Sequence, residues 1–289
     1  MDESSRILCF GEIVWDAMPA GIFLGGAPFN VAYHLGRHGN KVFPVSRIGK
    51  DFLGEETLRR MKAAGLPGDL VQVDPEHPTG AVVIELNESG DADYEILRNA
   101  AWDWIEPVPE LLEAASTAEV LVYGTLSTRG ENNAGLLEEL VSRVPFRLCD
   151  VNLRKPYDSV ANALAWASKA TLVKLNEEEL LRLAPAGTST DLQAKAEAFA
   201  GQTGVGTVIV TLAGKGAFIW HNGECYAGTG PKVEVSDTVG AGDAFTAGFI
   251  SRYLASGSLE EALQHALKVG SFVASCRGAQ PEYSPERFN

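Results

Sequence analysis

The segment Asp237-Thr238-Val239-Gly240-Ala241-Gly242-Asp243 leads directly into a run of small and apolar residues, 244–255. Its glycines, Gly240 and Gly242, allow the backbone to turn tightly and to approach a ligand closely. The small residues that follow favour a helix, and the N–H groups at a helix N-terminus point at an anion while the helix dipole favours negative charge. The segment therefore predicts an anion-binding turn at the start of a helix.

Asp243 closes this segment and is the candidate general base. A carboxylate beside a bound anion is electrostatically unfavourable unless it takes a proton from a nucleophile. The alternative is an ordinary helix start with an Asp in its first turn.

Strand-like and helical segments alternate along the rest of the chain. We expect strands at Arg6–Val14, Lys41–Ile48, Val120–Tyr123, Arg147–Val151, Thr171–Leu175 and Thr207–Leu212. We expect helices at Pro28–His38, Phe52–Ala64, Glu131–Arg143, Ser159–Ser168, Asn176–Leu183, Asp191–Gln202, Ala241–Ala255 and Leu259–Cys276. Several strands are apolar throughout, which is typical of strands covered on both faces, so the sequence predicts an α/β fold with a parallel sheet between layers of helices.

Two segments interrupt this alternation. Trp15–Leu24 is short and flanked by glycines, and we expect a loop there. Residues 79–97 predict a hairpin, with strands at Ala81–Leu86 and Tyr94–Leu97 around an Asn-Glu-Ser-Gly turn. The interruptions form either a small separate sheet, which would serve as a mobile cover, or an antiparallel extension of the main sheet.

A second glycine-containing segment, Gly25–Gly39, predicts a tightly packed entry into a helix, with Pro28 in its first turn. Asn30 would project near the helix start, where its amide can bind a polar ligand. His34 and His38 share one helix face. A third metal ligand is not evident, so we expect them to be solvated histidines on the helix surface.

Polar residues also follow three of the expected strands, at the sheet edge where ligands collect in open α/β folds. After one strand comes Asp150-Val151-Asn152-Leu153-Arg154, for which a salt bridge is the alternative. After the next, Asn176 and Glu179 suit either a helix-capping box or the organisation of water around Mg²⁺. In Thr211–Gly216 the glycines allow the backbone to line a nucleotide, or form an ordinary hairpin turn.

Composition excludes several classes of protein. The chain has 289 residues, 45% of them hydrophobic, which is too apolar for disorder and long enough to bury a core without disulfides. A net charge of −14 argues against nucleic acid and anionic membranes as partners. No apolar run is long enough to cross a membrane, and the N-terminus predicts no secretory signal. The four cysteines are far apart in sequence and predict reduced thiols in a cytoplasmic protein, with Cys9 and Cys149 in buried strands. Neither a GxGxxG dinucleotide fingerprint nor a Walker loop is present.

Together these segments resemble the ribokinase-like (PfkB) carbohydrate kinase family over nearly the whole chain. Gly25–Gly39 and Asp237–Asp243 match its two signatures in order and separation, and residues 95–103 and 150–154 are most similar to the fructokinase-type branch. The resemblance implies a three-layer α/β/α sandwich with a mainly parallel central sheet and a small β-sheet lid. It implies one kinase domain over residues 1–289, with lid segments 15–25 and 79–98 inserted in it.

The resemblance also implies a role for each matching residue. Asp243 would take the proton from a sugar hydroxyl, and the N–H groups of Gly240, Ala241 and Gly242 would hold the transferring γ-phosphoryl group. The sugar-side residues implied are Asp16, Gly26 and Asn30, which would hold hydroxyls, and Arg98 and Arg154, near the sugar or its phosphate. The nucleotide-side residues implied are Lys174, Asn176, Thr211, Gly214, Gly216, Gly242 and Ser271. Asn176 and Glu179 match a motif that organises Mg²⁺ through water, and Asp237, Val239 and Gly278 would bind a monovalent cation such as K⁺.

The activity implied is ATP-dependent phosphorylation of a sugar, with fructose favoured. The alternatives are a kinase for ribose, 2-keto-3-deoxygluconate or a nucleoside, and a non-catalytic member of the family that only binds sugar or nucleotide. Apolar residues of the expected lid strands, Val82, Ile84 and Leu86, either pair across a homodimer or rest on the sugar.

Overall fold

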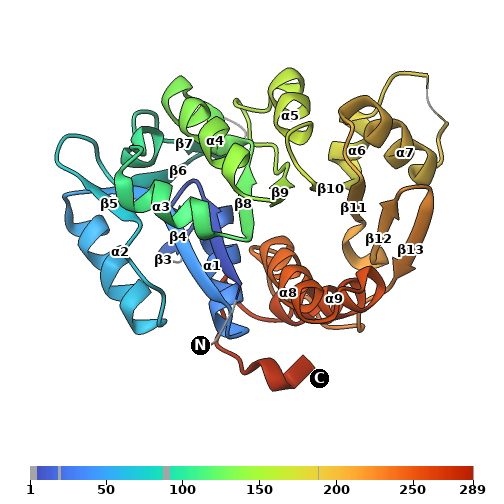
Figure 1. Ribbon diagram of the computed structural model, residues 1–289. Coiled ribbons are helices and arrows are strands. Elements are labelled where there is room, and N and C mark those ends of the chain that lie inside the picture. The colour runs from blue at the N-terminus through green and yellow to red at the C-terminus, as the bar shows by residue number, and fades with distance from the viewer. Residues whose placement is uncertain (1–4, 19–20, 87–91, 188, 289) are drawn as a thin grey trace.

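A nine-stranded sheet forms the centre of the computed structural model (Figure 1). The structure describes residues 5–18, 21–86, 92–187 and 189–288. Across the sheet the strands follow the order β13-β12-β11-β10-β9-β8-β1-β4-β5. Neighbours from β11 to β5 run parallel, and β12 and β13 are antiparallel additions at one edge. The bounds are β1 Arg6–Phe10, β4 Lys41–Gly49, β5 Val71–Asp74, β8 Val120–Gly124, β9 Phe146–Asp150, β10 Leu172–Asn176, β11 Thr207–Thr211, β12 Ala217–His221 and β13 Glu224–Gly228.

Helices cover both faces of this sheet, which confirms the predicted three-layer sandwich. In β1, Leu8 and Phe10 belong to one apolar cluster, and Ile7 and Cys9 belong to another on the opposite face. The first cluster includes residues of α3 (Pro109–Thr117), α4 (Glu131–Arg143), α5 (Val160–Ala167), α6 (Glu177–Leu183) and α7 (Leu192–Thr203). The second includes residues of α1 (Ala27–Arg37), α2 (Phe52–Ala63), α8 (Ala241–Ser256) and α9 (Leu259–Ala274).

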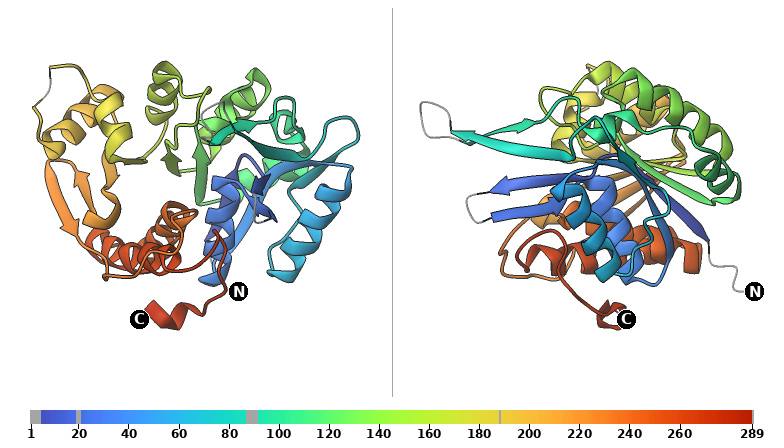
Figure 2. Two further views of the ribbon diagram at one scale, coloured as in Figure 1. Left: turned by 180° about the vertical axis from the view of Figure 1, so that it is seen from behind. Right: turned by 90° about the vertical axis from the view of Figure 1, so that its left-hand side faces the viewer.

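A separate four-stranded sheet projects from this body, as the right-hand view of Figure 2 shows. Its order is β3-β2-β6-β7, with bounds β2 Val14–Met18, β3 Gly21–Gly25, β6 Gly80–Leu86 and β7 Ala92–Ile96. The alternative of an antiparallel extension of the main sheet was therefore wrong. The predicted Asn-Glu-Ser-Gly turn lies outside the described residues.

The expectation of a loop at Trp15–Leu24 was also wrong, because β2 and β3 lie there as an antiparallel pair. Strand β2 also pairs in parallel with β6, so its conformation depends on a partner distant in sequence. The Trp15 indole N–H donates to Thr57 Oγ1 of α2 at 3.0 Å and ties the small sheet to the body.

The predicted strand Arg6–Val14 is in fact divided between the two sheets, because β1 ends at Phe10 and β2 begins at Val14. Gly11 lies at the break with φ +145°, and a Cβ there would approach Ser127 Oγ to 2.5 Å. Helix α3 and strands β5, β12 and β13 were not predicted, whereas α4 has the predicted bounds. Among the described residues, no helix is both long and apolar enough to span a lipid bilayer.

Candidate active site

The turn predicted to bind an anion lies at the N-terminus of α8. Gly240 is the N-cap residue and has a left-handed φ of +76°, and a Cβ there would come within 2.6 Å of Ala279. Both facts require glycine. Within the described part of the chain, the N–H groups of Gly240 and Gly242 meet no protein acceptor, and that of Ala241 donates to the Thr238 carbonyl at 3.3 Å. The turn thus leaves two backbone donors without a described acceptor at a helix N-terminus, and their binding of an anion stays a prediction.

Asp243 lies in the first turn of α8, partly exposed beside these donors. Asn30 of α1 donates its Nδ2 to Asp243 Oδ2 at 2.8 Å. Burial raises the pKa of Asp243 to about 7, and the negative charge of Asp150 adds to the rise, while Lys174 and Asn30 oppose it. A carboxyl that titrates near neutral pH has the driving force needed to accept a proton.

This raised pKa predicts how activity depends on pH. The carboxyl of Asp243 is protonated below about pH 7 and cannot act as a base there. We therefore expect kcat/KM, which reports the free enzyme, to rise with pH through an apparent pKa near 7 and then to level off. A profile that is already flat at pH 5 would contradict the role of Asp243, and a stability measurement at each pH serves as the control for unfolding.

A buried ion pair lies beside Asp243. Asp150 ends β9 and is the cross-strand partner of Lys174 in the middle of β10, with Lys174 Nζ 2.7 Å from Asp150 Oδ2. Thr246 of α8 donates its Oγ1 to the same oxygen at 3.2 Å. Burial lowers the pKa of Lys174, but Asp150 outweighs it, so the pKa stays above its usual value. A Cβ on Gly242 would lie 3.4 Å from Lys174 Nζ, which places the ammonium at the anion-binding turn.

Asn176 and Glu179 form a reciprocal capping box at the start of α6, which was the alternative prediction. Asn176 Oδ1 accepts from the N–H of Glu179 at 2.9 Å, and Glu179 Oε2 accepts from the N–H of Asn176 at 2.9 Å. Glu179 Oε1 accepts from the N–H of Leu153 at 2.8 Å. A carboxylate oxygen has two lone pairs, so each oxygen can still accept a bond from a metal-bound water. This geometry fits Mg²⁺ held through water.

Asp237 is hydrogen-bonded to Val239 and Gly278, the other two residues of the predicted cation site. Its Oδ1 accepts from the N–H of Val239 at 3.0 Å, and its Oδ2 accepts from the N–H of Gly278 at 3.1 Å. The contacts seen here are therefore hydrogen bonds between a carboxylate and two backbone N–H groups. The role of these residues toward K⁺ stays a prediction.

The predicted sugar-side residues come from the small sheet, the start of α1 and the loop after β9. Gly26 has φ +109°, and a Cβ there would meet the Glu12 carbonyl oxygen at 2.3 Å, so only glycine fits before α1. Burial raises the pKa of Asp16 in β2, and the positive charge of Arg154 opposes this rise. Arg154 has the same effect on Asp243, which places its charge near both carboxylates. Arg98 is exposed beyond the end of β7, and no described contact joins it to this group.

Three of the predicted nucleotide-side residues, Thr211, Gly214 and Gly216, lie at the turn between β11 and β12. Thr211 ends β11, and a Cβ on Gly216 would approach the Gly228 carbonyl oxygen to 2.1 Å. The chain then passes Gly230, where a Cβ would meet Ser271 Oγ at 2.3 Å. A pocket of about 620 Å³ lies beside this turn, lined by Leu212, Lys215, Ala217, Phe218, Ala227, Gly228, Thr229 and residues 190–193. The alternative prediction of a hairpin turn is confirmed, because β11 and β12 are antiparallel.

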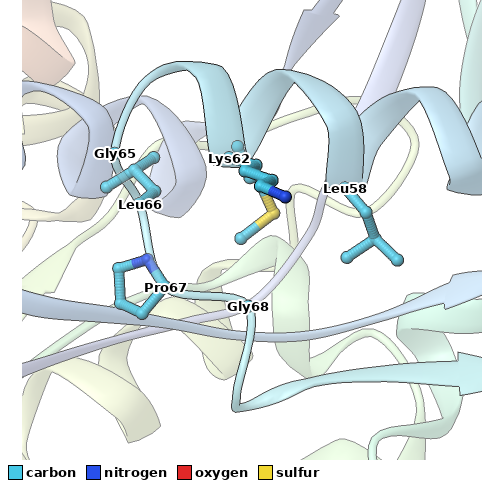
Figure 3. A pocket seen from close by; sticks show the side chains of 7 residues that line it. Leu58, Lys62, Gly65, Leu66, Pro67 and Gly68 are labelled. Atoms are coloured by element: carbon cyan, nitrogen blue, oxygen red, sulfur yellow. The ribbon is translucent and has the colours of Figure 1, made fainter.

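A second pocket, of about 480 Å³, lies at the C-terminal end of α2 (Figure 3). It is lined by Leu58, Met61, Lys62, Gly65, Leu66, Pro67 and Gly68. None of these belongs to the predicted site, and Lys62 is the one charged side chain among them.

The prediction for His34 was wrong, because this residue is fully buried rather than solvated. Its ring bonds Tyr283 Oη through Nδ1 and the Ala279 carbonyl through Nε2, each at 2.9 Å. Burial lowers its pKa to about 4. His38 is half-buried, and its Nε2 is buried beside the rings of His265, Tyr283 and Phe288, so it is less solvated than predicted.

Two further residues of the site were missed from the sequence. Thr246 lies one helical turn beyond Asp243, and that spacing could have indicated it. Gln280 donates its Nε2 to Asn30 Oδ1 at 2.8 Å, and no sequence pattern points to it.

The fold and this site define a class of protein. A helix N-terminus with N–H groups that meet no described acceptor, a carboxyl of raised pKa and a paired lysine meet at the carboxyl edge of a parallel sheet. Phosphoryl transfer requires this combination of positioning, charge neutralisation and a base. Residues 3–287 match the pfkB family carbohydrate kinase description, and the chain belongs to this family.

Named relatives and solved structures extend this match. The chain is 28% identical to "Probable fructokinase-6, chloroplastic" of Arabidopsis thaliana, over 96% of this chain and 80% of that protein. The crystal structure of a fructokinase with bound ATP from Xylella fastidiosa superimposes with a TM-score of 0.82 at 24% identity, covering 96% and 94% of the two chains. A fructokinase double mutant from Vibrio cholerae O395, bound to fructose, ADP and potassium, gives 0.83 at 23% identity, covering 97% and 95%. At these identities the two structures show the same fold.

Proposed function

We propose that this chain, as one kinase domain over residues 1–289, transfers the γ-phosphoryl group of ATP to a sugar hydroxyl, with fructose as the sugar. The observation that carries the proposal is the carboxyl of Asp243, with its pKa near 7, placed in the turn whose N–H groups at Gly240 and Gly242 meet no acceptor among the described residues. Fructose is favoured because the relative at 28% identity is named a fructokinase.

The mechanism follows from this placement. Asp243 accepts the proton of the attacking hydroxyl, a bond forms between that oxygen and the γ-phosphorus, and the bond from phosphorus to the bridging oxygen of ATP breaks. The products are ADP and a sugar phosphate. Backbone N–H groups of residues 240–242 bind the transferring group, and losing such a preorganised donor costs roughly 10²–10³ in rate. Lys174 adds positive charge at the same turn.

The remaining predicted residues bind the substrates and ions. Asp16, Gly26, Asn30, Arg98 and Arg154 hold the sugar or its phosphate, and Thr211, Gly214, Gly216 and Ser271 line the nucleotide. Asn176 and Glu179 hold Mg²⁺ through water, and Mg²⁺ when bound neutralises phosphate charge. We keep Asp237, Val239 and Gly278 as the proposed residues of a monovalent cation site.

A coupled kinase assay over ketoses, aldoses, sugar acids and nucleosides tests the proposed substrate. We expect the highest kcat/KM with fructose. The Asp243→Asn variant, purified in the same way, measures the contribution of contaminating kinases. A higher value with ribose, 2-keto-3-deoxygluconate or a nucleoside would replace fructose, and no turnover with any acceptor would favour a non-catalytic binding protein.

The small sheet is proposed as a lid over the sugar. Asp16 of β2 lies in it, and a site that excludes water protects ATP from hydrolysis. We expect replacement of residues 84–94 by a short glycine linker to weaken sugar binding and to raise the ratio of ATP hydrolysis to sugar phosphorylation. Unchanged sugar affinity together with unchanged hydrolysis would refute the lid, and an unchanged melting temperature of the body is the control.

Dimerisation through the lid and a cytoplasmic location also remain proposals. Ile22 and Val83 are 50% and 37% exposed and share one face of the small sheet by register, which supports an interface there. Val82 instead packs toward the cluster of Val14, Ile96 and Trp102. The side chains of Ile84 and Leu86 lie outside the described part of the structure.

A further inference from the structure

Two side-chain amides join Asp243 to the segment that follows α9. Gln280 Nε2 donates to Asn30 Oδ1 at 2.8 Å, and Asn30 Nδ2 donates to Asp243 Oδ2 at 2.8 Å. Gln280 Nε2 also donates to the Leu24 carbonyl oxygen of β3 at 3.2 Å. The proposed function uses Asn30 and Asp243 but gives Gln280 no role.

The orientation of both amides follows from the Leu24 carbonyl. A backbone carbonyl oxygen only accepts hydrogen bonds, so the Gln280 side chain must present its NH₂ group to it. That same NH₂ group contacts Asn30, which must therefore present its oxygen. The NH₂ group of Asn30 is then left to face Asp243. The Leu24 carbonyl oxygen can only accept, so it sets the direction of every hydrogen bond in this chain of amides.

We propose that Gln280 is a positioning residue that holds the Asn30 amide with its NH₂ group toward the Asp243 carboxylate. The inference deepens the proposed function, since it takes Asp243 as the base. A carboxylate stabilised by an N–H donor ionises more readily. Without Gln280, the Asn30 amide is free to rotate and present its oxygen, which favours the protonated form of Asp243.

The backbone around Gln280 is anchored well enough for this role. The Ala279 carbonyl bonds His34 Nε2 at 2.9 Å, and the Pro281 carbonyl accepts from Tyr33 Oη at 3.3 Å. The Tyr283 carbonyl accepts from Arg37 Nε at 3.0 Å. These alternate residues of the segment are all held by α1, the helix that also carries Asn30. The position of Gln280 between them is therefore determined by the same helix.

Other charges also act on Asp243 and must be separated from this effect. Asp150 from β9 raises its pKa, and Lys174 from β10 and Arg154 from the loop after β9 lower it. Glu12, after β1, lies close enough for its titration to respond to Asp243. Gln280 is uncharged, so its replacement by leucine leaves all four of these charges in place.

The test is the titration of Asp243 in the ligand-free protein, followed through its carboxyl carbon by NMR. In Gln280→Leu we expect the pKa of Asp243 to rise by about half to one unit, as the loss of one hydrogen bond predicts. We expect kcat/KM near pH 6 to fall about threefold to tenfold, while the plateau at high pH and the KM for ATP stay near wild type. Gln280→Glu cannot donate when ionised and should shift the titration further in the same direction.

Tyr283→Phe is the matched control, because it removes a hydrogen bond to His34 from the same segment without touching the amide chain. We expect it to lower stability and leave the titration of Asp243 unchanged. An equal shift in Tyr283→Phe, or none in either Gln280 variant, would overturn the proposal. If neither variant folds, the wild type decides: the side-chain amide resonances of Asn30 and Gln280 must move with the titration of Asp243. Because the NMR titration needs no turnover, it is independent of whether the chain phosphorylates fructose.

Discussion

Asp243→Asn is expected to lower kcat by ~10²–10⁴ while sugar and nucleotide still bind. The substituted amide has nearly the same shape and can still accept the hydrogen bond from Asn30 Nδ2 through its oxygen. It cannot take a proton from the sugar hydroxyl. Single-turnover kinetics together with calorimetric binding of each substrate separate the loss of chemistry from a loss of affinity.

The same variant should not be destabilised, and this distinguishes loss of the base from misfolding. The pKa of Asp243 is raised in the folded state, so the folded protein holds this proton more tightly than the unfolded chain does. Ionisation of Asp243 therefore reduces the free energy of unfolding progressively from about pH 4 to pH 7. Above pH 7 we expect Asp243→Asn to melt no lower than wild type. Asp158→Asn, at a half-buried residue paired with Arg182 away from the site, is the control for the substitution itself. Near wild-type turnover in Asp243→Asn would rule out the base assignment.

Lys174→Met is expected to reduce the free energy of unfolding by ~3–5 kcal/mol, because it leaves a buried carboxylate unpaired. Asp150 then keeps its bond from Thr246 but loses the ammonium at 2.7 Å. Loss of the positive charge also removes an influence that lowers the pKa of Asp243. We therefore expect the acid limb of kcat/KM to move to higher pH as well. Urea unfolding and the pH profile measure the two effects separately.

Two further variants make this result specific. Lys169→Met breaks a surface pair with Glu138, and such pairs contribute about 0–1 kcal/mol. The double variant Asp150→Asn with Lys174→Met removes both charges, and we expect it to recover most of the lost stability. Activity should stay low in the double variant if Lys174 binds the nucleotide phosphates. A Lys174→Met protein as stable as wild type would show that the pair does not stabilise the fold.

Local patterns were enough to predict much of the architecture. Helix α4 has the bounds that its amphipathic spacing predicts, and the capping box of Asn176 and Glu179 starts α6 as expected. In these cases hydrogen bonds and packing within a few residues determine the conformation. The parallel pairing of β2 with β6 was missed because β6 is distant in sequence, and nothing within Trp15–Leu24 records that pairing.

The residues of the site likewise divide into those that the sequence predicts and those that only the tertiary structure brings together. The sequence by itself determined the glycine turn, the helix behind it and the carboxylate of Asp243, because conformational freedom and helix capping are local properties. Asn30 lies far before Asp243 in the sequence, and Gln280 lies after it. Only the tertiary structure decided that these three residues form one hydrogen-bonded group. It also decided that His34 is buried. Such contacts depend on how parallel strands and α1 bring remote segments together, and hydrogen-bond direction is set only once those segments meet.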